Sequence, residues 1–168
     1  KIIKLKILSS GKNDLHVPFE LLGKKCAMNC CCSNNTYQLK SSKPGNLIIH
    51  IHGGGFVAMS SSSHENYLRK WANTLNAPIF SIDYSLAPES QFPVALNEIY
   101  QAYLWIIEKS GVKAGKIVLA GDSAGGNLVL ALSCLLIVTN KRLPDFLVLA
   151  YPAVHLSMNS FSPSTLVA

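Results

Sequence analysis

A glycine-flanked serine at residues 121–125 (GDSAG) is the feature that most constrains how this chain can fold. It lies between an apolar run at 116–120, typical of a short buried strand, and residues 127–139, whose apolar spacing predicts a helix. A strand that reverses into a helix within a few residues strains its central residue and brings neighbouring backbones close together. Residues without a Cβ atom fit on either side of such a turn. The segment therefore predicts a serine hydroxyl exposed at the carboxyl end of a strand, beside a helix N-terminus that favours negative charge.

This pentapeptide has a second explanation when it is taken alone. A glycine-rich turn that merely packs a helix on a sheet has the same pattern, which arises by chance in roughly one in twenty chains of this length. In the interpretation as a nucleophile turn, Ser123 is the catalytic nucleophile, and Gly121 and Gly125 allow the close backbone approach. Asp122 is then placed by the turn and is not the acid of a catalytic triad.

A run of three glycines strengthens the catalytic interpretation. His52, Gly53, Gly54 and Gly55 directly follow an apolar run at 47–51, and such a tetrapeptide arises by chance in roughly one chain in a thousand. Consecutive glycines after a strand can turn their N–H groups toward one point, where an oxyanion needs donors. A phosphate cradle is the competing use, but neither G-x-x-x-x-G-K-[ST] nor G-x-G-x-x-G occurs. We therefore predict an oxyanion hole formed by the three glycines.

The amide of Ala124, which follows the serine, is expected to supply a further donor to this oxyanion hole. His52 has two possible roles, since it can orient the glycine turn through hydrogen bonds or contact substrate. His50 alternates with isoleucines in the predicted strand, and we interpret it as structural. Asp83 and Glu89 are expected to brace nearby loops through hydrogen bonds. His64 precedes a glutamate as in zinc proteases, but no second histidine follows at the required spacing.

Together the motifs resemble the hormone-sensitive-lipase group of α/β-hydrolases. Residues 83–89 (DYSLAPE) are similar to that group's D-Y-x-L-A-P-E signature. The resemblance covers about residues 46–168, which would form the N-terminal part of a catalytic domain. Residues 1–45 are left as an unassigned N-terminal segment with possible edge strands.

The resemblance implies a serine carboxylester hydrolase or lipase that acts through an acyl-enzyme on acylglycerol, cholesteryl or other esters. It also implies that no metal and no organic cofactor takes part, and that the enzyme is cytoplasmic and visits lipid-droplet surfaces. An alternative from another class is a ligand-binding or interaction module, because some members of this fold keep the pocket and have lost hydrolysis.

The general base and its acid are the missing parts of the predicted site. A serine hydroxyl needs a histidine to take its proton and an acid to hold that histidine. After Ser123 the sequence contains one acid, Asp145, and one histidine, His155. Asp145 precedes the strand predicted at 146–151, which places it roughly 20 Å from Ser123 at the opposite sheet edge. We interpret Asp145 as a solvated loop acid. His155 follows the same strand and lies at the sheet edge of Ser123, so an approach to Ser123 is the alternative to a surface residue, which we favour. The chain is therefore expected to be truncated before both triad partners and nearly inactive alone.

From residue 46 onward, strands and helices alternate in the sequence. This alternation predicts an α/β fold with a doubly wound, mostly parallel sheet, a partial α/β-hydrolase whose C-terminal strands are missing. Residues 2–8 alternate in a way that suits an edge strand, whereas 11–45 show little pattern beyond a possible strand at 36–40. The predicted strands are 47–51, 79–84, 117–120 and 146–151, and the predicted helices are 63–76, 93–110 and 127–139. The first of these helices is expected to present Tyr67, Leu68, Trp71 and Leu75 on one face.

The composition limits the classes of partner that the chain is expected to bind. The chain is 49% hydrophobic and 14% charged, which permits a packed core, and its net charge is +6. Its lysines are scattered, whereas a nucleic-acid surface needs a denser basic stripe with interleaved aromatics. Weak attraction to an anionic lipid surface competes with an ordinary solvated basic face, and we favour the latter. No apolar run reaches the ~18 residues needed to cross a bilayer.

The five cysteines do not form a familiar metal-binding pattern. Cys26, Cys30, Cys31 and Cys32 cluster, but no second pair of cysteines or histidines accompanies them at metal-site spacing. The total of five cysteines is odd, and the N-terminus does not have the pattern of a signal peptide. Both points favour reduced thiols in a cytosolic setting. Cys134 lies on an apolar helix and is expected to fill the core.

Overall fold

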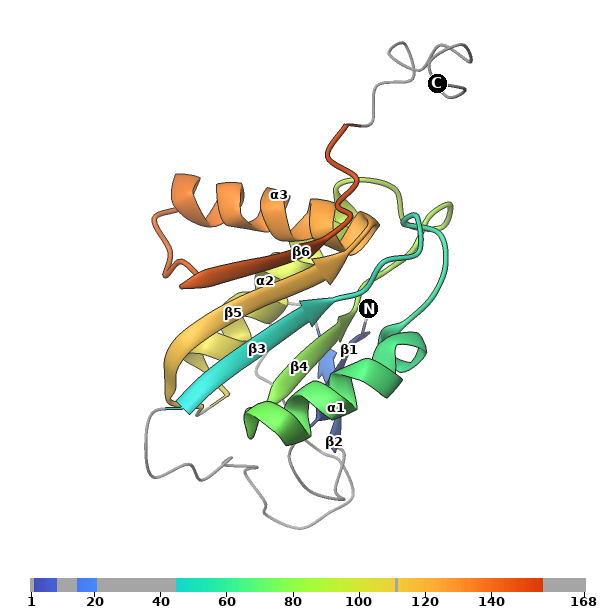
Figure 1. Ribbon diagram of the computed structural model, residues 1–168. Helices are drawn as coiled ribbons and strands as arrows, with labels where there is room; N and C mark the ends of the chain where they lie inside the picture. The colour runs from blue at the N-terminus through green and yellow to red at the C-terminus, as the bar shows by residue number, and fades with distance from the viewer. Residues whose placement is uncertain (1, 9–14, 21–44, 111, 156–168) are drawn as a thin grey trace, which may run out of the picture.

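One mixed sheet organises the molecule. The computed structural model describes residues 2–8, 15–20, 45–110 and 112–155. Six strands lie in the order β2-β1-β4-β3-β5-β6, with β4, β3, β5 and β6 parallel and β1 antiparallel to both of its neighbours (Figure 1). The mostly parallel α/β sheet predicted from the alternation is confirmed. The strands are β1 (Ile2–Leu8), β2 (Leu15–Glu20), β3 (Gly45–Ile51), β4 (Ile79–Asp83), β5 (Ala114–Asp122) and β6 (Phe146–Ala150).

Helices cover both faces of this sheet, as expected of a doubly wound fold. A short 3₁₀ turn, η1 (Ser61–His64), leads into α1 (Glu65–Leu75) on one face. On the opposite face lie α2 (Val94–Glu108) and α3 (Ala124–Val138) (Figure 1). Each helix connects two parallel strands, and parallel strands need crossovers of this kind. The predicted helices are therefore confirmed, with ends that differ by a few residues.

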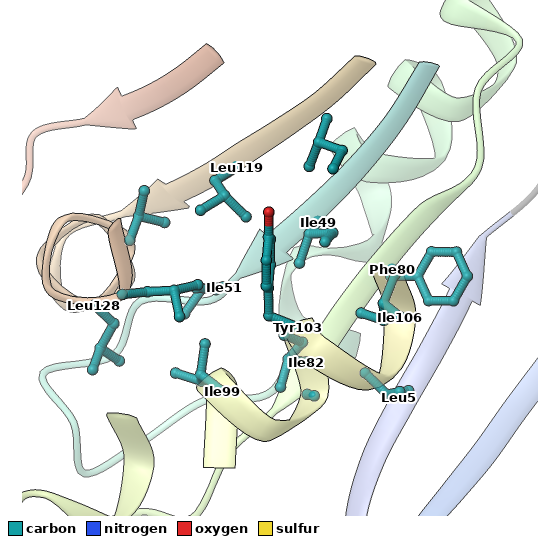
Figure 2. Packing of buried hydrophobic residues seen from close by; sticks show 14 of the residues in the cluster. Leu5, Ile49, Ile51, Phe80, Ile82, Ile99, Tyr103, Ile106, Leu119 and Leu128 are labelled. Atoms are coloured by element: carbon teal, nitrogen blue, oxygen red, sulfur yellow. The ribbon is translucent and has the colours of Figure 1, made fainter. Parts of the chain in front are cut away.

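The core is divided in two by the sheet because strand side chains alternate between its faces. Ile49 and Ile51 of β3 point into the larger cluster beneath α2 and α3, whereas Ile48 packs with Leu68 on the α1 side. In the larger cluster the fully buried ring of Tyr103 lies among labelled isoleucines and leucines of the strands (Figure 2). Burying each such large side chain contributes about 1.5–3 kcal/mol to folding.

The prediction of an edge strand at residues 2–8 is wrong, because β1 lies between β2 and β4. The alternating lysines suggested an exposed face, but Lys6 is only 5% exposed. Its ammonium group forms an ion pair with Glu65 at the start of α1. Hydrogen bonds from Lys6 and Arg69 lower the pKa of Glu65 to about 2. An ion pair with the covering helix thus allows an interior strand to carry a buried lysine.

The expected apolar face of α1 is only partly buried, and the expected burial of Cys134 is wrong. On α1 the structure buries Leu68 and Ala72, whereas Trp71 and Leu75 are 37% and 58% exposed. The face of α1 that meets the sheet is therefore narrower than the apolar pattern indicated. Cys134 is exposed rather than in the core, because α3 turns other side chains to the sheet. The buried apolar side chains of α3 are Ala124, Leu128, Val129, Leu132 and Leu136.

Two sequence expectations cannot be compared with the structure, and one observed strand was not expected. The possible strand at 36–40 and the cysteine cluster at 26–32 lie outside the described residues. β2, in contrast, was not predicted at all. Of the helices in the described part of the chain, none combines the length and the apolarity that crossing a membrane requires.

Candidate active site

The two glycine-containing motifs meet at the carboxyl edge of the sheet. The arrowheads of β3, β4, β5 and β6 point to the same side in Figure 1. Ile51, the last residue of β3, pairs with Gly121 of β5 on one side and with Ile82 of β4 on the other. Because the strands end at the same level, the turn that begins at His52 lies beside the turn that contains Ser123.

Ser123 sits in the strained turn that the sequence predicts. Its backbone has φ 49° and ψ −117°, a conformation that costs a non-glycine residue about 1–3 kcal/mol. Two hydrogen bonds hold it there: the Ser123 N–H donates to the Ala150 carbonyl at 2.9 Å, and the Ala153 N–H donates to the Ser123 carbonyl at 3.1 Å. The chain around the end of β6 thus fixes the serine at the N-terminus of α3.

Close backbone packing explains the glycines on both sides of the serine. A Cβ atom on Gly121 would lie 2.6 Å from the carbonyl carbon and oxygen of Gly125. A Cβ atom on Gly125 would lie 2.1 Å from the Ile51 carbonyl oxygen. Both contacts are with backbone atoms, which cannot rotate away. The predicted steric role of these glycines is confirmed.

The glycine turn adopts conformations that suit glycine and is clamped to the nucleophile turn. Gly54 and Gly55 have positive φ values of 114° and 62°. The Gly53 N–H donates to the Asp122 carboxylate at 3.0 Å. That N–H is therefore already occupied, which leaves Gly54, Gly55 and Ala124 as candidate oxyanion donors. As the first residue of α3, Ala124 has no carbonyl one turn earlier to accept its N–H.

His52 lies beneath the glycine turn and is 1% exposed. Its Nδ1 atom lies 2.7 Å from the Gly53 carbonyl oxygen, to which it donates. Its ring stacks on Tyr84 with centroids 4.3 Å apart, and the Tyr84 hydroxyl donates to the His52 carbonyl at 2.8 Å. Burial lowers the pKa of His52. Of the two roles left open for this histidine, these contacts favour orienting the turn.

His50 is a structural residue, as expected. Its Nδ1 lies 3.0 Å from the Ser81 hydroxyl and its Nε2 lies 2.9 Å from the Tyr67 hydroxyl. Burial, aided by the nearby His64, lowers the pKa of His50 to about 3. Burial likewise raises the pKa of Tyr67. These neutral groups form a polar layer under the site.

Carboxylates brace the loops around the site, although one of them is not the predicted one. Asp83 accepts the N–H of Ser61 at 2.6 Å and its hydroxyl at 2.9 Å, as expected. Glu98, rather than the exposed Glu89, accepts the N–H and the hydroxyl of Ser85, both at 2.7 Å. Glu98 lies one residue before Ile99 on the buried part of α2. An acid on an apolar helix face was the signal that could have identified it.

His64 is the other functional neighbour that sequence reasoning missed. Its Nε2 atom lies 3.2 Å from each oxygen of Asp122, and its Nδ1 lies 3.2 Å from the Ser60 carbonyl. Its side chain is 8% exposed. The only sequence signal was the His-Glu pair, which suggested a metal motif. Within the described residues no group of three or more potential metal ligands exists.

The two candidate triad partners in the sequence lie in different places. Asp145 accepts the Ile117 N–H at 2.8 Å at the amino edge of the sheet, as its position before β6 predicts. It is thus a bracing residue as well as a solvated acid. His155 is exposed. The hydrogen bonds of His50, His52 and His64 described above are with groups other than the Ser123 hydroxyl.

Two cavities flank these turns. One of about 190 Å³ lies between the α1 side and the ends of β5 and β6, with Tyr67, Trp71 and Asp122 in its wall. The other, of about 320 Å³, is lined mainly by apolar atoms and includes Phe56, next to the glycine turn, and Leu128 of α3. A largely apolar space therefore adjoins both the glycine turn and the nucleophile helix.

Comparison with known proteins agrees with this geometry. Residues 48–167 match the family model described as alpha/beta hydrolase fold. Mouse hormone-sensitive lipase is 51% identical over 125 residues, which cover 73% of this chain and 16% of that protein. An esterase of Acinetobacter venetianus is 36% identical, covering 69% of this chain and 38% of that protein. A Pyrobaculum calidifontis esterase structure superposes with a TM-score of 0.68 at 36% identity, covering 77% of this chain and 43% of that one.

The fold and the site define a class of protein, in which a parallel α/β sheet carries a serine in a strained strand-to-helix turn. The chain belongs to the alpha/beta hydrolase fold family, in its hormone-sensitive-lipase group. It spans 12–17% of the length of the hormone-sensitive lipases compared.

Proposed function

We propose that this chain carries the nucleophile and the oxyanion hole of a serine carboxylester hydrolase. The observation that carries the proposal is the meeting of the Ser123 turn with the His52–Gly55 turn at one sheet edge. The strained serine at a helix N-terminus is partly exposed, and adjacent backbone N–H groups suit the negative charge that develops when it attacks. Both halves of this arrangement come from this chain.

In the proposed reaction the Ser123 hydroxyl attacks the acyl carbonyl carbon and passes its proton to a histidine base. The carbonyl oxygen becomes an oxyanion that accepts hydrogen bonds from Gly54, Gly55 and Ala124. Collapse of this intermediate expels the alcohol, which takes the proton back from the histidine, and leaves an acyl-enzyme. Water activated by the same base then attacks the acyl carbon and releases the acid, which restores the serine.

The base and its acid are proposed to come from sequence outside this chain. Asp145 lies at the amino edge of the sheet, where it cannot orient a base beside Ser123. Apolar side chains of the outer strand β6 also support a larger domain, since Phe146, Leu147 and Val148 are 40–54% exposed. Residues 46–168 would then be the N-terminal part of the catalytic domain, and this chain by itself would be nearly inactive.

The proposed substrates are lipid esters such as acylglycerols or cholesteryl esters. The relatives support this class, since the similar proteins are called hormone-sensitive lipase and esterase. The apolar cavity of about 320 Å³ beside the glycine turn suits a hydrocarbon chain. A cytoplasmic enzyme that visits lipid-droplet surfaces is proposed from the resemblance of the motifs alone, and no role in binding nucleic acid is proposed.

Hydrolysis of p-nitrophenyl butyrate by the complete gene product tests the proposal. We expect Ser123→Ala to lower kcat at least about 10⁴-fold, as removal of a triad nucleophile does. The matched control is Ser133→Ala, ten residues along the same helix, where the hydroxyl only donates to the Val129 carbonyl. A wild-type protein that binds esters without hydrolysing them would favour the ligand-binding alternative instead.

A further inference from the structure

One carboxylate connects the two turns of the proposed site. An oxygen of Asp122 accepts the Gly53 N–H at 3.0 Å, although the two residues are 69 positions apart. His64 approaches the same carboxylate, with its Nε2 3.2 Å from both oxygens. Asp122 therefore lies between the nucleophile turn, to which it belongs, the glycine turn and the end of η1.

We propose that Asp122 and His64 are positioning residues that hold the glycine turn in register with Ser123. With Gly53 fixed to Asp122, the next two N–H groups, those of Gly54 and Gly55, are presented toward the carbonyl that Ser123 attacks. This inference rests on the proposed function and deepens it, because it assigns the device that aligns nucleophile and oxyanion donors. Neither residue is assigned to take a proton from the serine.

The loop after the glycines shows why such a device is needed. Within the loop, the N–H groups of Val57 and Ala58 both donate to the Gly54 carbonyl, at 3.2 and 3.0 Å. Its far end is held by Asp83, which accepts two hydrogen bonds from Ser61, and by the contact of His64 Nδ1 with the Ser60 carbonyl. These bonds shape the loop and tie it to β4 and η1. Asp122 is the clamp that reaches the loop from β5, the strand that carries the nucleophile.

The geometry suits a carboxylate at residue 122 and a glycine at residue 53. The Gly53 N–H donates to one oxygen of Asp122 and His64 Nε2 lies against the same carboxylate, whereas an asparagine would keep one oxygen acceptor and replace the other by a donor. A Cβ atom on Gly53 would lie 2.3 Å from Asp122 Oδ2. The first glycine of the turn therefore serves the approach of the carboxylate. His64, buried beside His50 and Tyr67 with ring centroids 5.5 and 5.8 Å away, limits the freedom of the carboxylate from the other side.

The test compares Asp122→Asn with Asp145→Asn in the complete gene product. Asp145 is the matched control because it also accepts a backbone N–H, that of Ile117 at 2.8 Å, but at the opposite sheet edge. We expect Asp122→Asn to lower kcat by about 10²-fold, since misplaced oxyanion donors act in the transition state and not in substrate binding. KM should change less than about threefold, and Asp145→Asn should leave kcat within about twofold of wild type.

A second pair of variants keeps the test decisive if Asp122→Asn fails to fold. His64→Ala should lower kcat about tenfold, and His64→Gln, whose amide N–H can reach the carboxylate, should recover most of that loss. Affinity for a trifluoromethyl ketone, which forms an oxyanion on the serine, should fall in parallel with kcat/KM. If His64 had a purely structural role, His64→Ala would have a lower melting temperature, but its affinity for the ketone would not fall in parallel with kcat/KM.

Each contrary outcome has a distinct meaning. Wild-type kcat in folded Asp122→Asn, or an equal loss of kcat in Asp145→Asn, overturns the positioning role and leaves the proposed function standing. Equal kcat in His64→Ala and wild type overturns the part assigned to His64. A wild-type protein without esterase activity overturns the proposed function, and this inference with it.

Discussion

Two aspartates at opposite edges of the sheet each accept a hydrogen bond from a backbone N–H, but the surroundings of the two carboxylates differ. Asp145, at the amino edge, accepts the Ile117 N–H at 2.8 Å, and Asp122, at the carboxyl edge, accepts the Gly53 N–H at 3.0 Å. The first bond joins the starts of two neighbouring strands. The second lies one residue from Ser123 and joins two turns with strained or positive-φ backbone. A carboxylate–backbone bond thus acquires a functional role from what it aligns.

The largest effect is expected from Gly125→Ala, which places a Cβ atom in the close backbone packing at the carboxyl edge and should destabilise the fold. A glycine-to-alanine change inside a helix ordinarily stabilises by about 1 kcal/mol. Here the new Cβ would lie 2.1 Å from the Ile51 carbonyl oxygen. We expect a net destabilisation of at least about 3 kcal/mol, as for severe overpacking against backbone. Thermal unfolding followed by circular dichroism measures it, and an unchanged or raised melting temperature would contradict the close approach.

The two ends of β3 give the next test, because Gly45 begins the strand and Gly53 lies two residues beyond its last residue. Gly53→Ala places a Cβ 2.3 Å from Asp122 Oδ2, whereas a Cβ on Gly45 meets nothing within 4 Å. We expect Gly53→Ala to lower kcat for ester hydrolysis about 10²-fold by displacing the turn. Gly45→Ala should leave kcat unchanged. Similar steady-state kinetics for the two variants would contradict the claim that only the carboxyl edge of the sheet positions the catalytic groups.

Acidification should weaken the polar layer beneath the site. Because burial lowers the pKa of His50 to about 3 from 6.5, the unfolded chain binds a proton between these values that the folded chain does not. Stability should therefore be full above pH 6.5 and fall as the pH drops below it, by about 1.4 kcal/mol per pH unit for one proton. Melting temperatures of wild type and His50→Gln from pH 7 to pH 5 measure this loss.

His52 shares this pH dependence, so the variant is judged by the slope of melting temperature against pH. His64, Asp122 and His52 face His50, and His52 also has a pKa lowered by burial. His50→Gln should reduce the slope of melting temperature against pH by about one proton's share and leave part of it. Parallel slopes for the two proteins would show that His50 does not stay neutral in the folded state.

The smallest effect is expected at the amino edge. The Tyr103 hydroxyl donates to the Arg142 carbonyl at 2.8 Å, and burial raises the pKa of Tyr103 to about 12. Tyr103→Phe should lower the free energy of unfolding by about 1 kcal/mol, the usual net contribution of one hydrogen bond. kcat should stay within about twofold of wild type, since the bond is remote from Ser123. A larger loss of kcat would show that the two edges are coupled.

Much of the fold and part of the site could be predicted from the sequence. The strand-to-helix turn at Ser123 was predictable because its glycines have a steric reason that holds wherever such a turn occurs. The parallel strands followed from their alternation with helices. The opposite position of Asp145 followed from strand direction alone, because it precedes β6.

The remaining features depend on contacts between residues distant in sequence. Lys6 is buried because Glu65 lies above it, and no local pattern announces that ion pair. The Gly53 N–H was expected to face an oxyanion but instead donates to Asp122, a partner known only once β3 and β5 are adjacent. His64 was considered as half of a metal motif because its true neighbour, Asp122, is 58 positions away.

Labelling with a fluorophosphonate probe tests the central claim most directly. The probe reacts with a serine that a base activates, and peptide mapping identifies the modified residue. We predict rapid labelling of Ser123 in the complete gene product, none in its Ser123→Ala variant, and little in residues 1–168 alone, which lack the proposed base. Rapid labelling of a serine other than Ser123 in the complete product would contradict the assignment of the nucleophile. Rapid labelling of Ser123 in the isolated chain would show that its base lies within these residues.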